Sequence, residues 1–339
     1  MVKRLNYWQL KSILFFDKEL IPQASVQFRK RTLTYTVMKA LQTSVVLITI
    51  MFTSIVGAQQ LPQFTQYMFN TISVNPAYAG SREAMNLTAL HRNQWAGIDG
   101  NPVTSTFSFH TPLNNERVGL GLSYITDQLG FESTNYVYGD FSYTIPVSFE
   151  AKLSFGLKAG FTNYSLENPD VNDPFFNSNF NSWKPNFGAG VYLSTNRWYA
   201  GISSPRILNT DLNEGEFLAL ERTSYYAIGG LVLDLSLDIK FRPSVITKFT
   251  NGAPATYDAT AGFLFYEKFW AGASYRFNDA SNFGAYMDYQ VSKDIRIGYA
   301  YDLPTGDFRP YTGGTHEIIL IFEPRLTKKT DLYKSPRYF

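Results

Sequence analysis

The chain has 339 residues, of which 45% are hydrophobic, 17% aromatic and 17% charged, with 24 Gly and no Cys. The lack of Cys excludes disulfide scaffolds, zinc-thiolate sites and thiol nucleophiles, and three His leave little for a His-based metal site. Residues 1–58 carry eight Lys or Arg against two Asp or Glu, a surplus of +6, so the rest carries −4 of the total +2. The main part of the chain therefore lacks the cationic surface of a nucleic-acid binder.

The first feature along the chain is an export signal. Met38 and Lys39 precede the apolar run SVVLITIMF (44–52), and Val56 and Ala58 are the small residues before the expected cut. This pattern predicts a signal peptide over 38–58 and a mature chain that begins at Gln59. The apolar run is shorter than the roughly 20 residues of a spanning helix, so an uncleaved anchor is the weaker alternative. We interpret residues 1–37 as an extension from a wrongly assigned upstream start.

Residues 59–83 come next and include the stretch QFTQYMFNTISVNPAYAG (63–80). This stretch is aromatic, rich in amides and free of charge, and Pro76 and Gly80 prevent a regular helix. Its role depends on the structure that follows it.

From residue 84 to 323 the dominant pattern is strict alternation. In KLSFGLKAGFT (152–162) every second residue is apolar, and the residues between are small or polar. This period predicts strands with one apolar face and one small or polar face. About 14 segments of suitable length for tilted membrane strands fit the pattern: 84–97, 103–113, 117–129, 133–147, 151–166, 186–196, 198–206, 223–235, 237–250, 256–267, 269–278, 282–292, 294–303 and 313–323.

A soluble sandwich also alternates, so the period alone does not choose between a sandwich and a barrel. The signal peptide, the even number of strands and their length favour an all-β, antiparallel transmembrane barrel of the bacterial outer membrane over residues 84–323. Connections alternate between short (292–294) and long (205–224), as in such barrels. Aromatic residues near strand ends are expected to form interfacial belts: Trp95, Trp198, Tyr199, Tyr266, Trp270 and Tyr301.

The chain has no motif typical of an enzyme. Gly119 and Gly121 resemble the start of a dinucleotide motif but lie in an alternating strand without a following helix. His316 and Glu317 do not continue as H-E-x-x-H, and a barrel hydrolase would have to use His110 or His316. We therefore predict no catalytic, cofactor-binding or metal residues.

Two polar features have open interpretations. The loop DVNDP, with Asp170, Asn172 and Asp173, has oxygen ligands for Ca²⁺ but lacks EF-hand spacing, so a solvated loop is the simpler interpretation. Arg296 paired with Asp288 or Glu317 would form a polar network inside the barrel, and isolated rim charges are the equal alternative.

The opening stretch resembles the N-terminal signature of the PorP/SprF family, outer-membrane proteins of the type IX secretion system of Bacteroidetes. The similarity continues through HRNQWAGIDGNPVTSTFSFHTPL and later blocks, so that it covers nearly all of residues 60–323. The residues that match the family motifs, and are candidate partner contacts, are Pro62, Gln63, Phe64, Gln66, Tyr67, Asn75, Pro76, Tyr78, Gly80, Arg92, Gln94, Trp95 and Gly97.

The resemblance implies a non-enzymatic outer-membrane barrel without cofactors that supports export or surface retention of large surface proteins, such as gliding adhesins. Its implied partners are outer-membrane lipid, the periplasmic ring of the secretion machinery, and an adhesin or its C-terminal signal domain, with no nucleic acid. The alternative function is a diffusion channel or small-solute transporter. We expect the basic tail 324–339 to lie in the periplasm, either as a disordered end or as a docking segment.

The opening stretch, within residues 59–83, is suited either to plug the lumen or to pack under the periplasmic mouth. We favour the mouth, because both ends of an even-stranded barrel emerge on that side. In either place we expect Gln63, Gln66, Asn70 and Asn75 to satisfy inward-facing polar groups.

Overall fold

The computed structural model describes residues 63–113, 117–167, 180–211, 220–277, 283–305 and 309–324. The chain divides into two units, 1–55 and 56–339, and every described residue belongs to the second. The predicted extension, the signal peptide, the DVNDP loop and the tail beyond Pro324 lie outside the described residues.

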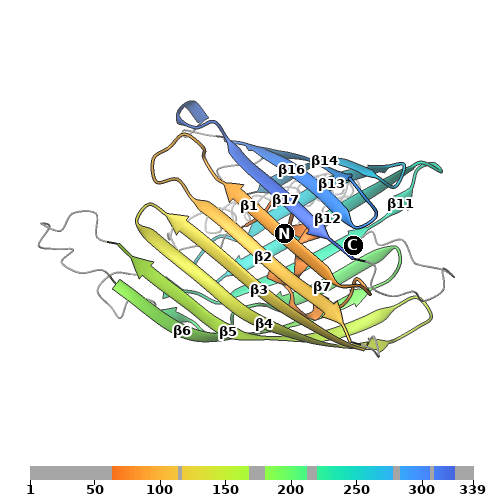
Figure 1. Ribbon diagram of the computed structural model, residues 1–339, viewed down its shortest axis with the longest axis horizontal. Coiled ribbons are helices and arrows are strands. Elements are labelled where there is room, and N and C mark those ends of the chain that lie inside the picture. The colour runs from red at the N-terminus through yellow and green to blue at the C-terminus, as the bar shows by residue number, and fades with distance from the viewer. Residues whose placement is uncertain are drawn as a thin grey trace, which may run out of the picture. The chain divides into compact units, whose positions relative to one another are not determined.

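Fourteen antiparallel strands form a closed barrel (Figure 1). Neighbours in the ring are consecutive along the chain, and β1 pairs with β17 to close it. The strands are β1 (Asn86–Asn93), β2 (Val103–Pro112), β3 (Val118–Leu129), β4 (Glu132–Pro146), β5 (Lys152–Leu166), β6 (Phe180–Ser194), β7 (Trp198–Ser204), β10 (Ser224–Leu231), β12 (Ile239–Thr250), β13 (Thr256–Phe265), β14 (Phe269–Phe277), β15 (Phe283–Gln290), β16 (Ile295–Leu303) and β17 (Thr315–Phe322).

Short elements complete the fold. The two-residue strand β11 (Leu233–Asp234) pairs with β12, and β8 (Thr210–Asp211) pairs with β9 (Leu220–Glu221) outside the ring. Four single turns of 3₁₀ helix are η1 (Tyr67–Phe69), η2 (Thr71–Ser73), η3 (Pro76–Tyr78) and η4 (Arg309–Tyr311). Among the described residues, no helix has the length and apolar character needed to span a membrane.

The predicted barrel is confirmed, and each of the 14 predicted segments corresponds to one strand of the ring. The largest error in a boundary is at β6, which begins at Phe180 rather than at residue 186. Pro185 obscured the start because it cannot donate a ladder hydrogen bond. The residue is tolerated because β6 pairs with β7 only from Ala189 onward, so the N–H that Pro185 lacks is not needed on that side.

The two faces of the wall differ as the alternation predicts. Along β5, Leu157 and Phe161 point outward with 62% and 53% of their surface exposed, whereas Lys158 and Thr162 are buried on the inner face. A continuous outer belt of exposed apolar side chains is the surface that a membrane barrel presents to lipid.

Two residues of the predicted aromatic belt face the lumen instead. Tyr199 and Trp270 are 5% and 2% exposed, and Trp270 lies beside the buried Arg242. Their neighbours Trp198 and Phe269 take the outward positions. Because successive strand residues point to opposite faces, only one residue of each aromatic pair can reach lipid.

The two ends of the barrel have different connections. Leu87 at the start of β1 pairs with Phe322 at the end of β17, so the chain enters and leaves the ring at one end. We call it the short-turn end, because it carries the connections 147–151, 195–197, 266–268 and 291–294. The opposite loop end carries the longer connections 94–102, 205–223 and 304–314, together with the two-residue turn 130–131. Short turns mark the periplasmic end of bacterial barrels.

We predict that Leu157→Arg destabilises the barrel in lipid by about 2–4 kcal/mol, because Leu157 lies in the middle of the outer belt. Leu303→Arg, on the outer face at the loop end of β16, should cost at most about 1 kcal/mol, because its guanidinium reaches the interface. Urea unfolding in phospholipid vesicles measures both costs. Equal costs at the two positions would contradict the assignment of the outer belt to lipid.

Candidate functional site: a segment inside the lumen

Residues 63–80, here called the lumen segment, lie inside the ring of strands (Figure 1). Its residues from Phe64 to Ile72 are 0–6% exposed. Contacts run from β16 and β17, through β2 to β4, to β6 and β7, so the segment crosses the lumen. Of the two expected placements, under the periplasmic mouth or in the lumen, the structure shows the lumen.

The loop-end part of the segment is held by one buried ionic cluster. Glu317 of β17 accepts hydrogen bonds from the backbone N–H groups of Thr65 (3.0 Å) and Gln66 (2.8 Å). The Thr65 hydroxyl donates to Asp302 of β16 at 2.7 Å. Arg92 of β1 pairs with Asp302 at 2.9 Å and with Glu317 at 3.1 Å. Four elements of the chain therefore meet at this cluster.

The cluster explains why the segment matters to the barrel. One guanidinium faces two carboxylates, each of which is at most 4% exposed, so the three side chains carry one uncompensated negative charge. Burying an uncompensated charge costs several kcal/mol unless hydrogen bonds satisfy it. The three donors from Thr65 and Gln66 supply those hydrogen bonds. The segment thus stabilises charges that the strands bring together.

Phe69 anchors the middle of the segment between two arginines. The guanidinium carbon of Arg242 lies 4.7 Å from the ring centre and that of Arg296 lies 5.6 Å from it. Tyr286 meets the same ring edge-on at 6.2 Å, and Arg242 also lies 4.0 Å from the ring of Trp270. Cation–π contacts away from water contribute on the order of 1–2 kcal/mol each.

Two of the four amide side chains meet the expectation of satisfying inward-facing groups. Asn70 donates to the Thr106 hydroxyl at 3.0 Å and accepts from the Ser108 hydroxyl at 2.8 Å. Asn75 donates to the backbone carbonyl of Val191 at 3.1 Å. Its oxygen also caps η3 by accepting from the N–H of Ala77.

The other two amides behave differently. Gln66 is fully buried, but within the described part of the chain its side-chain amide has no hydrogen-bond partner, and its hydrogen bonds are made by its backbone N–H and C=O. The amide nitrogen of Gln63 also has none there, and this residue is only half-buried. The prediction of a satisfying role for these two side chains finds no support in the geometry.

The segment leaves the lumen at the short-turn end. The Ser142 hydroxyl donates to the Ala79 carbonyl at 2.6 Å, and the Gly80 N–H donates to Nδ1 of His110 at 3.2 Å. Gly80 has φ of 74°, a left-handed conformation that favours Gly, and there the chain turns toward β1. His110 is thus committed to binding a backbone N–H, which argues against a role as a hydrolase base.

An ion pair fastens this exit. Arg82 binds Glu323, the residue after β17, through two nitrogens, and the Asn86 amide donates to the same carboxylate at 2.8 Å. Burial by itself would raise the pKa of Glu323, but Arg82 and Asn86 lower this pKa to about 2. The carboxylate in turn raises the pKa of Arg82, against the effect of burial.

Inward-facing glycines make room for the segment. A methyl group added to any of these glycines would overlap an atom of residues 66–79. Gly156, for example, lies against the backbone of Ala77, and a side chain there would force the segment away. The glycines in such contact are Gly119, Gly121, Gly156, Gly190, Gly201 and Gly298.

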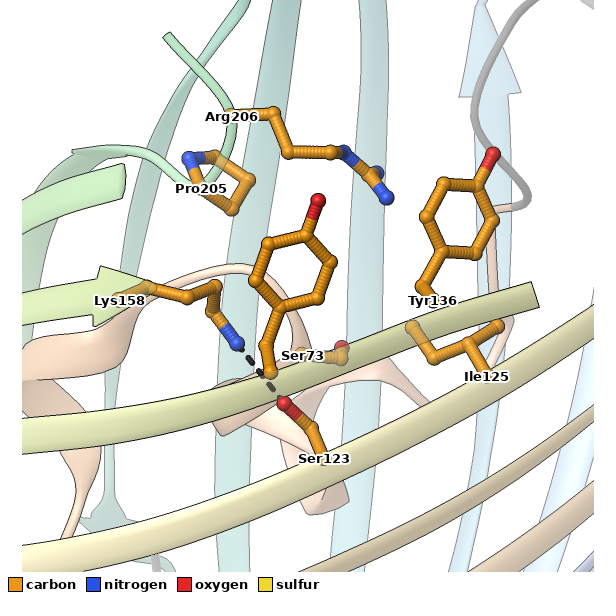
Figure 2. Close-up of a pocket in the computed structure, with 8 residues that line it drawn as sticks. Ser73, Ser123, Ile125, Tyr136, Lys158, Pro205 and Arg206 are labelled. Carbon is orange, nitrogen blue, oxygen red and sulfur yellow. Dashed lines mark hydrogen bonds between the residues drawn. The ribbon is translucent and has the colours of Figure 1, made fainter. Parts of the chain in front are cut away.

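Figure 2 shows a small pocket between the segment and the inward-folded connection after β7. Lys158 is paired with Asp140 at 2.8 Å, and Arg206 is paired with Glu221 at 3.1 Å and covers the ring of Tyr136. Because both cations are paired, the pocket has no free charge to select a ligand. Its lining residues are Ser73, Ser123, Ile125, Tyr136, Tyr138, Lys158, Pro205 and Arg206.

The structure brings together most of the residues singled out by sequence. Phe64, Gln66, Tyr67, Asn75, Pro76, Tyr78 and Gly80 belong to the lumen segment, and Arg92 binds it. Gln94, Trp95 and Gly97 lie apart, in the connection after β1, where the N–H of Trp95 donates to the Thr315 hydroxyl. Pro62 lies outside the described residues.

Two features of the ionic cluster differ from the sequence prediction: the partner of Glu317 and the presence of Asp302. Glu317 pairs with Arg92 and not with Arg296, whereas the predicted pair of Arg296 with Asp288 is present at 3.4 Å. Asp302 was not singled out, although its position in the alternation of β16 marks it as inward-facing. Within the part of the chain that the structure describes, no group of three His, Asp or Glu could hold a metal ion.

Comparison with known proteins adds a family and several barrels of similar architecture. The family model for the type IX secretion system membrane protein PorP/SprF matches residues 56–322, which include the lumen segment and the whole ring. No curated protein matches the chain.

Solved structures of similar architecture are outer-membrane barrels. The Acinetobacter baumannii outer membrane protein Omp33 is 10% identical, with a TM-score of 0.44 over 71% of this chain and 97% of that one. The CymD monoaromatic hydrocarbon channel is 12% identical, with a TM-score of 0.43 over 78% and 92%. A Pseudomonas aeruginosa FadL homologue is 12% identical, with a TM-score of 0.40 over 71% and 89%. Similarities this distant carry no argument about function.

We predict that Glu317→Gln loosens the lumen segment, because the two backbone N–H groups lose a charged acceptor and Arg92 loses a partner. Hydrogen bonds to charged groups are worth about 1.5–3 kcal/mol, so local opening should increase roughly 10- to 100-fold. Since the chain has no Cys, maleimide labelling of a Ser73→Cys reporter measures this opening. Asp238→Asn, at an exposed turn, is the control, and equal labelling of the two variants would contradict the anchor.

Gly156→Val tests the packing of the segment against the wall. The new side chain would overlap Ala77, so we expect amide hydrogens of residues 70–79 to lose protection from exchange. Gly139→Val on the outer face of β4 has no atom nearer than 3.9 Å and should leave that protection unchanged. Hydrogen exchange followed by mass spectrometry compares the two, and retained protection in Gly156→Val would place the segment elsewhere.

The ion pair of Arg82 with Glu323 should stabilise the protein less as the pH falls. Because the pKa of Glu323 is below its ordinary value of 4.5, its contribution is fully present above about pH 5 and is lost as pH falls toward about 2. We expect the difference in melting temperature between the native chain and Glu323→Gln to be largest near neutral pH and to vanish near pH 2. A difference that persists unchanged at pH 2 would contradict the pair.

Proposed function

Because the chain belongs to the PorP/SprF family of type IX secretion system membrane proteins, we propose that it serves that system as a non-enzymatic component which supports export or surface retention of large cell-surface proteins. The chain is an integral outer-membrane protein, so it can contact partners on both sides of that membrane. The observation that carries the proposal is the family match over residues 56–322, which leaves no strand of the ring outside it.

The geometry supports a binding role rather than a chemical one. The buried charged groups of the lumen are engaged with each other and with the chain's own segment, as in the cluster of Arg92, Asp302 and Glu317. His110 accepts a backbone hydrogen bond, and His316 faces outward and bonds Tyr299 at 2.7 Å. His110 faces the lumen, but its Nδ1 is bound to the backbone of the lumen segment, and His316 lacks the inward placement that a hydrolytic site in the lumen would require.

The proposed partners follow from the two ends of the barrel. The short-turn end would face the periplasmic ring of the secretion machinery, since short turns mark the periplasmic side. The longer connections at the loop end would face the cell exterior and meet the exported protein, an adhesin such as those of gliding motility or its C-terminal signal domain. Lipid of the outer membrane would contact the apolar belt.

A diffusion channel or small-solute transporter is the second candidate. Fourteen strands enclose more space than an eight-stranded barrel filled by its own side chains. The lumen segment occupies part of that space, which disfavours free diffusion. Single-channel conductance in planar bilayers separates the two candidates, because a steady open pore in the native chain would favour the channel.

We expect deletion of the gene to remove one or a few large proteins from the cell surface and to leave most other exported proteins in place. Comparison of surface and secreted proteomes with a complemented strain measures this. Complementation with Asp238→Asn, whose change lies at an exposed turn, controls for expression. An unchanged proteome would refute the secretion role, and loss of all such export would indicate a general part of the machine.

A further inference from the structure

The barrel is complete without the lumen segment. The ring closes through β1 with β17 and through β10 with β7 and β12, and none of these pairings includes residues 63–80. Every backbone-to-backbone hydrogen bond made by described residues of the segment joins two residues of the segment or of its exit turn. The segment therefore lies in the lumen as a separate peptide, connected to the wall by residues 81–85.

The wall binds main-chain atoms of this peptide with side chains. Glu317 accepts two of its N–H groups, and His110 accepts a third. The hydroxyls of Ser203 and Ser142 donate to the carbonyls of Val74 (2.8 Å) and Ala79 (2.6 Å). Contacts of this kind recognise an extended or turned peptide whatever its side chains are.

Side-chain recognition is added at three places. Phe69 fits between Arg242 and Arg296, and Asn70 bonds the hydroxyls of β2. Near the exit, Tyr78 packs edge-on against His110 at 5.4 Å and Tyr192 at 5.5 Å. The glycines that line the path leave space for the backbone to approach the wall. The lumen thus has the properties of a peptide-binding groove closed into a ring.

We propose that the lumen is a peptide-binding site, which the chain's own residues 63–80 occupy and which a separate uncharged peptide rich in aromatic and amide side chains can occupy in their place. The occupied site is then a self-blocked state of the barrel. Because the strands pair without the segment, exchange of the peptide leaves the ring intact. The proposal holds whether or not the chain serves secretion, since it rests on the contacts of the lumen alone.

The test begins with the full chain, folded with its segment in place. A protease site inserted between Glu83 and Ala84, in the connection before β1, allows the segment to be cut free after folding, because Glu83 is exposed. The probe is a synthetic peptide of residues 63–80 with a fluorophore at its N-terminus. Fluorescence anisotropy reports its binding, and mass spectrometry reports the native segment that it displaces.

We expect the labelled peptide to bind the cut barrel saturably and to be displaced by unlabelled peptide. It should not bind the uncut chain. In the cut Glu317→Gln barrel its affinity should fall roughly 10- to 100-fold, because a charged acceptor of two N–H groups is lost. A peptide of the same composition in scrambled order should bind more weakly, because Phe69, Asn70 and Tyr78 lose their contacts.

Three results would overturn the proposal. The cut segment could stay in the barrel through extensive dilution while no labelled peptide enters. The ring could unfold when the segment leaves, as seen by loss of the heat-modifiable gel shift of folded barrels, which would make the segment an integral part of the fold. The scrambled peptide could bind as tightly as the native one and equally to Glu317→Gln, which would show non-specific adsorption.

Discussion

A wide barrel with a polar inner face must fill or hydrate its lumen, and this constraint shapes the whole molecule. Side chains alone fill a barrel of about eight strands, but this ring has 14. The chain meets the constraint with its own residues 63–80, for which glycines such as Gly156 and Gly190 leave space on the inner face. Strand alternation that places apolar residues on the outer face places small and polar residues on the inner face. The lumen segment packs against this inner face.

The ionic cluster of Arg92, Asp302 and Glu317 connects the strands of the wall to the lumen segment. Strand pairing brings the three side chains together across the closure of the ring, where β1, β17 and β16 are neighbours. The lumen segment then supplies the hydrogen bonds that the surplus negative charge requires. The placement of the segment thus depends on buried charges that the closure of the ring brings together.

Much of the fold could be predicted from sequence because every strand of a membrane barrel alternates between apolar residues that face lipid and small or polar residues that face the lumen. Strict period-2 alternation gave the 14 strands of the ring, and errors in their ends stayed small except where Pro185 interrupts β6. The alternation could not say which residue of a neighbouring aromatic pair faces inward. Tyr199 and Trp270 were therefore assigned to the wrong face.

The site was harder to predict, because it depends on which strands become neighbours and on the path of a segment without periodicity. Arg92 and the motif around Asn75 were singled out by resemblance to a family, but their partners were not. Asp302 lies far from Arg92 along the chain, and no local pattern connects the two. The choice between lumen and mouth required the spatial contacts of Thr65 with β16 and β17.

These contacts give residues 63–80 a physical role: they are the part of the chain that lies in the lumen of its own barrel. The central claim is tested most directly by crosslinking within the intact membrane. Asn70 and Ser108 touch in the lumen, and the chain has no other Cys to compete, so Asn70→Cys with Ser108→Cys should form a disulfide in cells. Asn70→Cys with Thr162→Cys, on the inner face of β5 and three strands away from β2, is the matched comparison. A crosslink in the first pair alone is the predicted result, and its absence in a folded barrel would contradict the placement of the segment.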